Sequence, residues 1–143
     1  MREQVVQNLR QSFSAYLDLV RGLPAGALEA KLVEASNTIG AQLWCVVGAR
    51  ESTTVAIERG SWPGFSCSLS SDDVKHADRI ETAMVRTVEE FDAVIESLNW
   101  DPGREKLLLG MLEHETQHQG QLIRYLYALE YPFPPAWAKR WNL

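Results

Sequence analysis

The chain has 143 residues, the usual size of one domain, and its 45% hydrophobic and 23% charged residues are typical of a globular protein. Its net charge of -5, with basic residues spread thinly, excludes the basic surface that nucleic-acid binding requires. The opening residues lack the apolar run of a signal peptide, and no apolar run is long enough to span a bilayer. The sequence therefore predicts a cytoplasmic protein with no membrane partner.

The first part of the chain predicts two long helices. Apolar residues at helical spacing indicate a helix over about residues 3–23, which a Pro-Ala-Gly turn ends. Residues 27–35 are good helix formers and predict a short second piece. Ser36 and Asn37 are suited to N-cap the next long helix, which we expect to run to about residue 59. That helix carries a strip of small residues, which either allows close helix packing or leaves room for a site: Ala41, Cys45, Gly48, Ala49 and Ser52.

A loop and a third helix follow. Residues 60–71 are rich in Gly, Ser and Pro and predict a loop, whose Trp62 and Phe65 indicate that it folds back onto the domain. The segment Ser70–Asp73 is suited to cap a third helix, which we expect over residues 74–98 because apolar residues recur there at steps of three or four.

The last long helix is predicted to begin at Asp101 as N-cap and Pro102 as its first residue. Residues 131–135 end it, and the two tryptophans of the tail, residues 136–143, indicate packing against the helices. No segment shows the alternation of a strand. The expected fold is all-α: one domain over residues 1–143, a four-helix bundle with a longer loop between the second and third main helices.

Two of the three histidines, His114 and His118, are four residues apart on the last helix and therefore share a face. They belong to a stripe at core-type spacing: Leu107, Met111, His114, His118, Leu122, Tyr125 and Leu129. Burying two imidazoles is costly, so a shared metal ion is a better interpretation than two neutral, hydrogen-bonded core histidines.

The letters HETQH, from His114 to His118, also match the H-E-x-x-H helix of zinc proteases, in which Glu115 would be the general base. Such proteases need a third ligand downstream and a lobe with strands. No histidine follows His118 and no strand is predicted, so the protease interpretation is disfavoured. Metal-assisted hydrolysis with Glu115 as base stays open as a further alternative.

A third metal ligand must come from elsewhere, because catalytic zinc sites use three protein groups and keep one position open. Cys45 is the best candidate, since it lies on the small-residue strip of the second helix, although a small buried hydrophobe is an equally good interpretation. Cys67 and Glu51 are weaker substitutes. Two cysteines are too few for a disulfide framework, so a bond between them is disfavoured.

Other polar residues have simpler interpretations. His76 is expected at the surface, and Gln117 and Gln121 are expected to be solvated amides. Arg50 is expected to pair locally with Glu51, although near a metal pocket it could bind a carboxylate substrate.

Three segments resemble the DinB-like (damage-inducible) four-helix-bundle family, whose superfamily includes bacterial thiol-dependent transferases and a mycothiol-dependent maleylpyruvate isomerase. The likeness rests on NTIGAQLWCVVGARES, which is similar to the second helix of the family, on HETQHQGQLIRYLY, which is similar to its last helix, and on FPPAWAKRWNL, which is similar to its ending. Together with the order of the helices, it covers nearly the whole chain.

The resemblance implies a divalent metal, zinc or nickel, held by one histidine from the second helix and two from the last. The last two correspond to His114 and His118, whereas the first corresponds to Cys45, where this sequence departs from the pattern. A thiolate with two imidazoles favours zinc over nickel or manganese.

The implied activity is metal-dependent transfer of a low-molecular-weight thiol to a small electrophile, and the implied assembly is a homodimer. The rival from another class is a non-catalytic, dimerising bundle with a vestigial metal site, associating through an apolar stripe on the first or third helix. The sequence names neither catalytic residues nor residues that bind the thiol.

Overall fold

Apolar residues at steps of three and four produce a structure that contains only helices, which confirms the all-α prediction. The structure is a computed structural model and describes residues 1–143. Its five α-helices are α1 (Arg2–Gly22), α2 (Ile39–Arg59), α3 (Ala77–Ser97), α4 (Pro102–Ala128) and α5 (Pro135–Trp141). Two single-turn 3-10 helices lie in the connections, η1 (Ala27–Glu29) and η2 (Asp73–Lys75).

The start of α4 is as predicted, and the start of α2 is shifted by two residues. Asp101 caps α4 by accepting a hydrogen bond from the Arg104 amide at 3.0 Å, and Pro102 is the first helical residue. Thr38 caps α2, accepting from the Ala41 amide at 3.0 Å. The predicted cap Ser36 instead accepts from the Leu32 amide at 2.9 Å, so its side chain stabilises the preceding turn.

Two predictions about short segments were wrong. Residues 27–35 form only the single turn η1, because helix-forming residues over so short a segment do not offset the cost of starting a longer helix. The Ser70–Asp73 capping pair is present, with the Ser70 amide 2.8 Å from Asp73 Oδ2 and the Asp73 amide 3.1 Å from Ser70 Oγ. It begins η2, however, and α3 starts only at Ala77.

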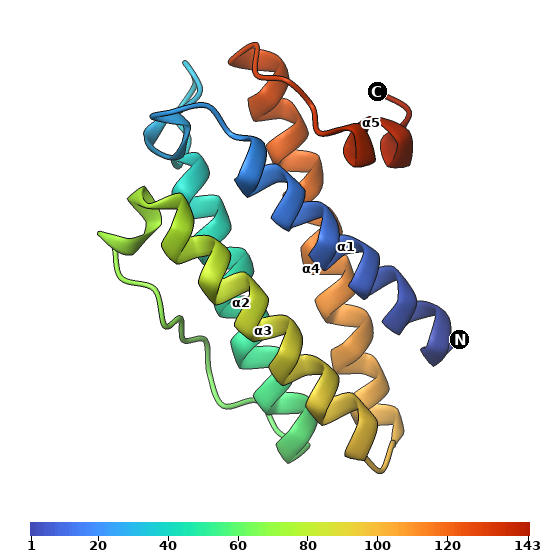
Figure 1. Ribbon diagram of the computed structural model, residues 1–143. Coiled ribbons are helices and arrows are strands. Elements are labelled where there is room, and N and C mark those ends of the chain that lie inside the picture. The colour runs from blue at the N-terminus through green and yellow to red at the C-terminus, as the bar shows by residue number, and fades with distance from the viewer.

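The four long helices pack so that α1 and α2 each contact both α3 and α4. Residues 60–76 run back along α2, so that α2 and α3 point in the same direction (Figure 1). The longer loop predicted between these two helices is therefore confirmed, and its length follows from this parallel arrangement.

The tail packs against α1 through Trp137, as predicted. Trp137 is fully buried, and its indole Nε1 donates a hydrogen bond to the Ala15 carbonyl at 2.7 Å. Its ring meets that of Tyr16 edge to face, with centroids 5.8 Å apart. The short helix α5 is thereby held on the outside of α1 (Figure 1).

The core consists of two apolar clusters separated by a polar layer. One cluster lies toward the beginning of α1 and includes Leu9, Phe13 and Phe91. The larger one includes Tyr16, Leu43 and Met84. Between them along the four long helices lie buried polar side chains: Ser12, Arg50, Thr54, Thr87, Glu115 and Gln119. The candidate site adjoins this layer. None of the helices combines the length and the apolar character needed to cross a membrane.

Candidate metal centre

The structure brings Cys45, His114 and His118 together between α2 and α4. Each can offer one ligand atom, and these atoms all lie within 4.8 Å of one another. Cys45 Sγ lies 3.7 Å from His114 Nε2. The two imidazole rings have centroids 4.5 Å apart, since a spacing of four residues places them one turn apart on the same face of α4.

The distances in this group fit one metal ion after a small adjustment. Bonds of roughly 2.0–2.3 Å in tetrahedral geometry place two ligand atoms roughly 3.3–3.6 Å apart. The separation of 3.7 Å between Cys45 and His114 is already close to that range. The outer limit of 4.8 Å requires rotamer shifts of about 1 Å. One sulfur and two nitrogen donors are also a set that zinc favours.

Burial keeps both imidazoles in the form that binds metals. It lowers the pKa of His114, and it lowers the pKa of His118 to about 4, with the nearby His114 as a second cause. Neutral imidazole has a free lone pair, so both rings are ready to act as ligands at neutral pH. Burial raises the pKa of the Cys45 thiol, which would therefore give up its proton only when a metal binds.

The Nδ1 atoms of the two imidazole rings have environments that differ from each other. His118 Nδ1 lies 2.6 Å from Gln42 Oε1, and this contact fixes the ring if Nδ1 carries the proton. His114 Nδ1 is buried and has no hydrogen-bond partner. A buried ring nitrogen without a partner is unfavourable, and a metal bound at Nε2, the nitrogen near Cys45, would leave Nδ1 without one.

The two weaker candidates for the third ligand lie in other interactions. Cys67 donates from Sγ to the Trp44 carbonyl at 3.5 Å, and burial raises the pKa of its thiol to about 11. Glu51 accepts hydrogen bonds from the Ser68 amide at 2.8 Å and from Arg86. Neither belongs to the group of Cys45, His114 and His118, so Cys45 is the residue that the geometry favours.

Behind the group, Arg50 and Glu115 form a fully buried ion pair, with 1% of each side chain exposed. Arg50 Nε lies 2.6 Å from Glu115 Oε1, and Arg50 Nη2 lies 2.9 Å from Oε2. The expected local pair of Arg50 with Glu51 was therefore wrong, because Glu51 pairs with Arg86 of α3. Arg50 faces the core and is not open to a substrate.

A chain of hydrogen bonds extends this ion pair to two other elements, α1 and α5. Ser12 of α1 donates to Glu115 Oε2 at 2.9 Å and accepts from Gln119 Nε2 at 2.5 Å. Trp141 of α5 donates from Nε1 to Gln119 Oε1 at 3.2 Å. These contacts hold both oxygens of the carboxylate in a fixed orientation, one residue away from His114.

The buried face of α4 is displaced from the predicted stripe. Leu107, His114 and Leu129 are only partly buried. The face that packs inward consists of Leu108, Met111, Glu115, His118, Gln119, Leu122, Tyr125 and Leu126. Glu115 and Gln119 have polar side chains, so the sequence does not reveal that they are buried unless their hydrogen-bond partners are known. His114 consequently lies at the edge of the core, beside solvent.

The remaining expectations about polar residues agree with the structure. Gln117 and Gln121 are exposed, as expected. His76 is exposed and lies 3.6 Å from Asp72, at the N-cap of α3.

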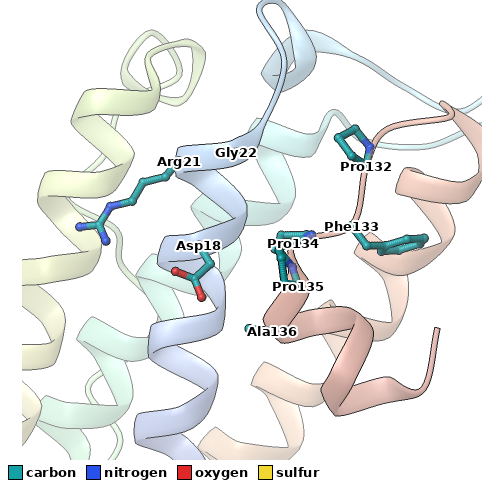
Figure 2. Close-up of a pocket in the computed structure, with 8 residues that line it drawn as sticks. All are labelled: Asp18, Arg21, Gly22, Pro132, Phe133, Pro134, Pro135 and Ala136. Atoms are coloured by element: carbon teal, nitrogen blue, oxygen red, sulfur yellow. The ribbon is translucent and has the colours of Figure 1, made fainter.

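The edge position of His114 opens it to a pocket of about 600 Å³ between α2, α4 and the loop that follows α2. A second pocket, of about 640 Å³, lies between the end of α1 and the proline-rich segment before α5 (Figure 2). Its charged lining groups are Asp18 and Arg21, of which Arg21 pairs with Glu81. Only the first pocket is lined by a residue of the candidate metal group.

No protein-family model matches this chain, and no curated protein matches it. Any function must therefore be argued from the site itself.

Proposed function

We propose that this protein is a DinB-like four-helix-bundle protein that binds a divalent metal ion, zinc, through Cys45, His114 and His118. The observation that carries the proposal is the convergence of these three ligand atoms within 4.8 Å from two different helices. We further propose that the metal site is catalytic and that it transfers a low-molecular-weight thiol to a small electrophile, as the family resemblance implies.

Three protein ligands would leave one coordination position open for a substrate, which is typical of catalytic zinc. A zinc ion held there would lower the pKa of a thiol that occupies the open position, as it does for bound water. In the transfer, a bond forms between the thiol sulfur and a carbon of the electrophile. The leaving group departs with its electron pair, and the thiol proton passes to solvent.

The residues around the ligands have distinct parts in this proposal. Gln42 would accept a hydrogen bond from Nδ1 of His118 and so leave Nε2 free to bind the metal. The ion pair of Arg50 and Glu115 anchors α2 against α4 directly behind the ligands. The pocket beside His114 gives a small molecule access from solvent.

Hydrolysis with Glu115 as general base is not supported by the geometry. Both carboxylate oxygens accept hydrogen bonds, from Arg50 and from Ser12, and the side chain is 1% exposed. A general base must reach a proton on its substrate or on a water. We therefore assign Glu115 a structural part beside the metal ligands.

The non-catalytic alternative would use an apolar stripe on α1 or α3 to form a dimer. Helix α1 exposes no large hydrophobic side chain, and α3 exposes only Val85, by 38%. The surface of these two helices therefore favours the metal-binding proposal over association through such a stripe.

Metal content and affinity test the proposal. Protein purified without a metal-affinity tag should contain about one zinc ion per chain by elemental analysis. Replacing a ligand, as in His118→Ala or Cys45→Ala, should weaken zinc binding by about 100-fold or more, since an outer partner alone is worth 10–100-fold. The chain offers matched controls, His76→Ala and Cys67→Ala, which should leave the affinity unchanged.

Thiol transfer is tested separately with zinc-loaded protein, 1-chloro-2,4-dinitrobenzene and a panel of low-molecular-weight thiols. Activity that disappears in His118→Ala and persists in His76→Ala would support the catalytic part. Only trace metal in the purified protein, together with equal zinc affinity in the His118→Ala variant, would disprove the site.

A further inference from the structure

The pocket beside His114 has walls from three parts of the chain. Helix α2 contributes Ala49 and Thr53, and α4 contributes one face from Gly103 to His114. The loop after α2 contributes Trp62 and Phe65. The volume of about 600 Å³ is in the range of pockets that take small molecules.

The aromatic wall is fixed in place by contacts that require a small residue on α2. A Cβ atom at Gly48 would lie 2.5 Å from Phe65 Cζ and 3.0 Å from the Ser66 carbonyl oxygen, so only glycine permits this approach. Ser52 Oγ accepts a hydrogen bond from the Ser66 amide at 2.9 Å. The ring of Phe65 also contacts that of Trp44, with centroids 5.1 Å apart.

Nothing in the fold covers these aromatic side chains on their outer side. Trp62 is 53% exposed and Phe65 is 45% exposed, although both line the pocket together with Leu107 and Met111. An apolar molecule in the pocket would remove part of this surface from water, which favours binding. The lining therefore fits a ligand with an aromatic or aliphatic body.

The pocket has a single permanently charged lining residue, Lys106. Its ammonium group takes part in none of the ion pairs of the structure. Lys106 and His114 are eight residues apart, which corresponds to about 12 Å along a helix axis. A cation thus lies toward one end of the pocket lining on α4, and His114 of the candidate metal group lies at the other end.

We propose that this pocket binds the electrophilic substrate, and that the substrate has an apolar, preferably aromatic, body and one carboxylate group. The carboxylate pairs with Lys106 at the rim, and the body lies against Trp62 and Phe65. The reactive end points toward His114, on the order of 10 Å from the carboxylate, given the helical rise. This inference rests on the proposed function, of which it names the substrate class.

Gly110 provides a way to fill the pocket without disturbing the fold. It lines the pocket, and a Cβ atom there would meet no other atom within 4 Å. Gly120, on the same helix, is equally open but does not line the pocket. Gly110→Leu and Gly120→Leu are therefore a matched pair, in which both variants gain the same helix propensity.

The probe is 1-naphthylacetate, with the neutral 1-naphthylacetamide for comparison, and binding is measured by isothermal titration calorimetry on zinc-loaded protein. The unmodified protein should bind the acid about two- to fivefold more tightly than the amide, the range of one exposed ion pair. Lys106→Gln should remove that preference. Gly110→Leu should weaken binding of both probes at least tenfold, whereas Gly120→Leu should leave it unchanged.

Zinc binding, measured in the same samples, separates this inference from the proposed function. Equal zinc affinity in both glycine variants, with probe binding lost only in Gly110→Leu, supports the pocket. Normal zinc binding without any probe binding, or equal probe binding in the two variants, overturns the pocket and leaves the metal site intact. Probe binding without zinc binding contradicts the proposed function, and with it the orientation of the substrate toward His114.

Discussion

Replacing Glu115 by glutamine keeps the size of the side chain but removes the negative charge that neutralises Arg50. The carboxylate accepts two hydrogen bonds from Arg50 and one from Ser12, all between 2.6 and 2.9 Å. Glutamine offers one acceptor oxygen, and its NH2 group would face the donors of the guanidinium. We expect Glu115→Gln to be strongly destabilising.

The magnitude follows from the burial of the pair. At an effective dielectric constant of about 20, two unit charges about 4 Å apart attract by about 4 kcal/mol. Breaking a buried ion pair by removing one partner costs about 3–5 kcal/mol, because the other charge stays buried without a partner. Arg50 is 1% exposed, and its Nη1 already has no hydrogen-bond partner. A loss of about 3–5 kcal/mol would be a large part of a typical free energy of unfolding of about 5–15 kcal/mol.

Urea denaturation at pH 7, followed by circular dichroism, measures this loss. Glu113→Gln is the matched control, since Glu113 is exposed on the same helix and should change the free energy of unfolding by less than about 0.5 kcal/mol. The double variant Arg50→Met/Glu115→Leu, which removes both charges, should be less destabilised than Glu115→Gln. A Glu115→Gln protein within about 1 kcal/mol of the unmodified protein would refute this account of the polar layer.

Two further predictions concern the surroundings of the ligands. Gln42→Ala should lower zinc affinity by about 10–100-fold, because the His118 ring loses its hydrogen-bond partner. The control Gln121→Ala, at the exposed face of α4, should leave the affinity unchanged. Competition with a fluorescent zinc chelator measures both affinities. In the metal-free protein, the pKa of His118 is lowered from 6.5 to about 4, so the unfolded chain binds more protons than the folded one between these values. The free energy of unfolding should therefore fall as the pH drops through this window, and it should fall less in His118→Gln; equal slopes in urea titrations from pH 7 to 4.5 would contradict the assignment.

The long helices could be predicted because their apolar residues repeat at helical spacing, and capping residues mark one of the starts well. Asp101 and Pro102 are such a start, and α4 begins there. The start of α3 could not be predicted from its capping residues. The Ser70–Asp73 pair has the right chemistry for a helix start, but the same pair closes a single 3-10 turn in this chain.

The candidate ligands could be proposed because His114 and His118 are linked by local geometry alone. Whether Cys45 is the third ligand depends on how α2 packs against α4, which the sequence does not give directly. The strip of small residues on α2 was the signal that pointed to Cys45. The strip borders the pocket, as one of the two alternatives suggested, and its close packing is against the loop that follows α2. Gly48 lets the loop approach α2 closely, and Ala49 lines the pocket.

The polar layer could not be predicted from the sequence, because its members pair with residues that are far away along the chain. Ser12, Arg50 and Glu115 come from three helices, and each alone has the sequence character of a surface residue. A buried charge can be recognised only once its partner is known. Gln42 likewise has no distinguishing signal in the sequence, apart from its position three residues before Cys45.

The candidate ligands and the aromatic wall of the pocket are carried by two different kinds of structure. Cys45, His114 and His118 lie on packed helices, whereas Trp62 and Phe65 lie on a connecting loop. Loops accept substitutions and insertions far more readily than packed helices do. If the proposed function holds, variation in this loop would change which molecules enter the pocket while Cys45, His114 and His118 keep their positions, so that substrate preference and metal binding would diverge independently during evolution.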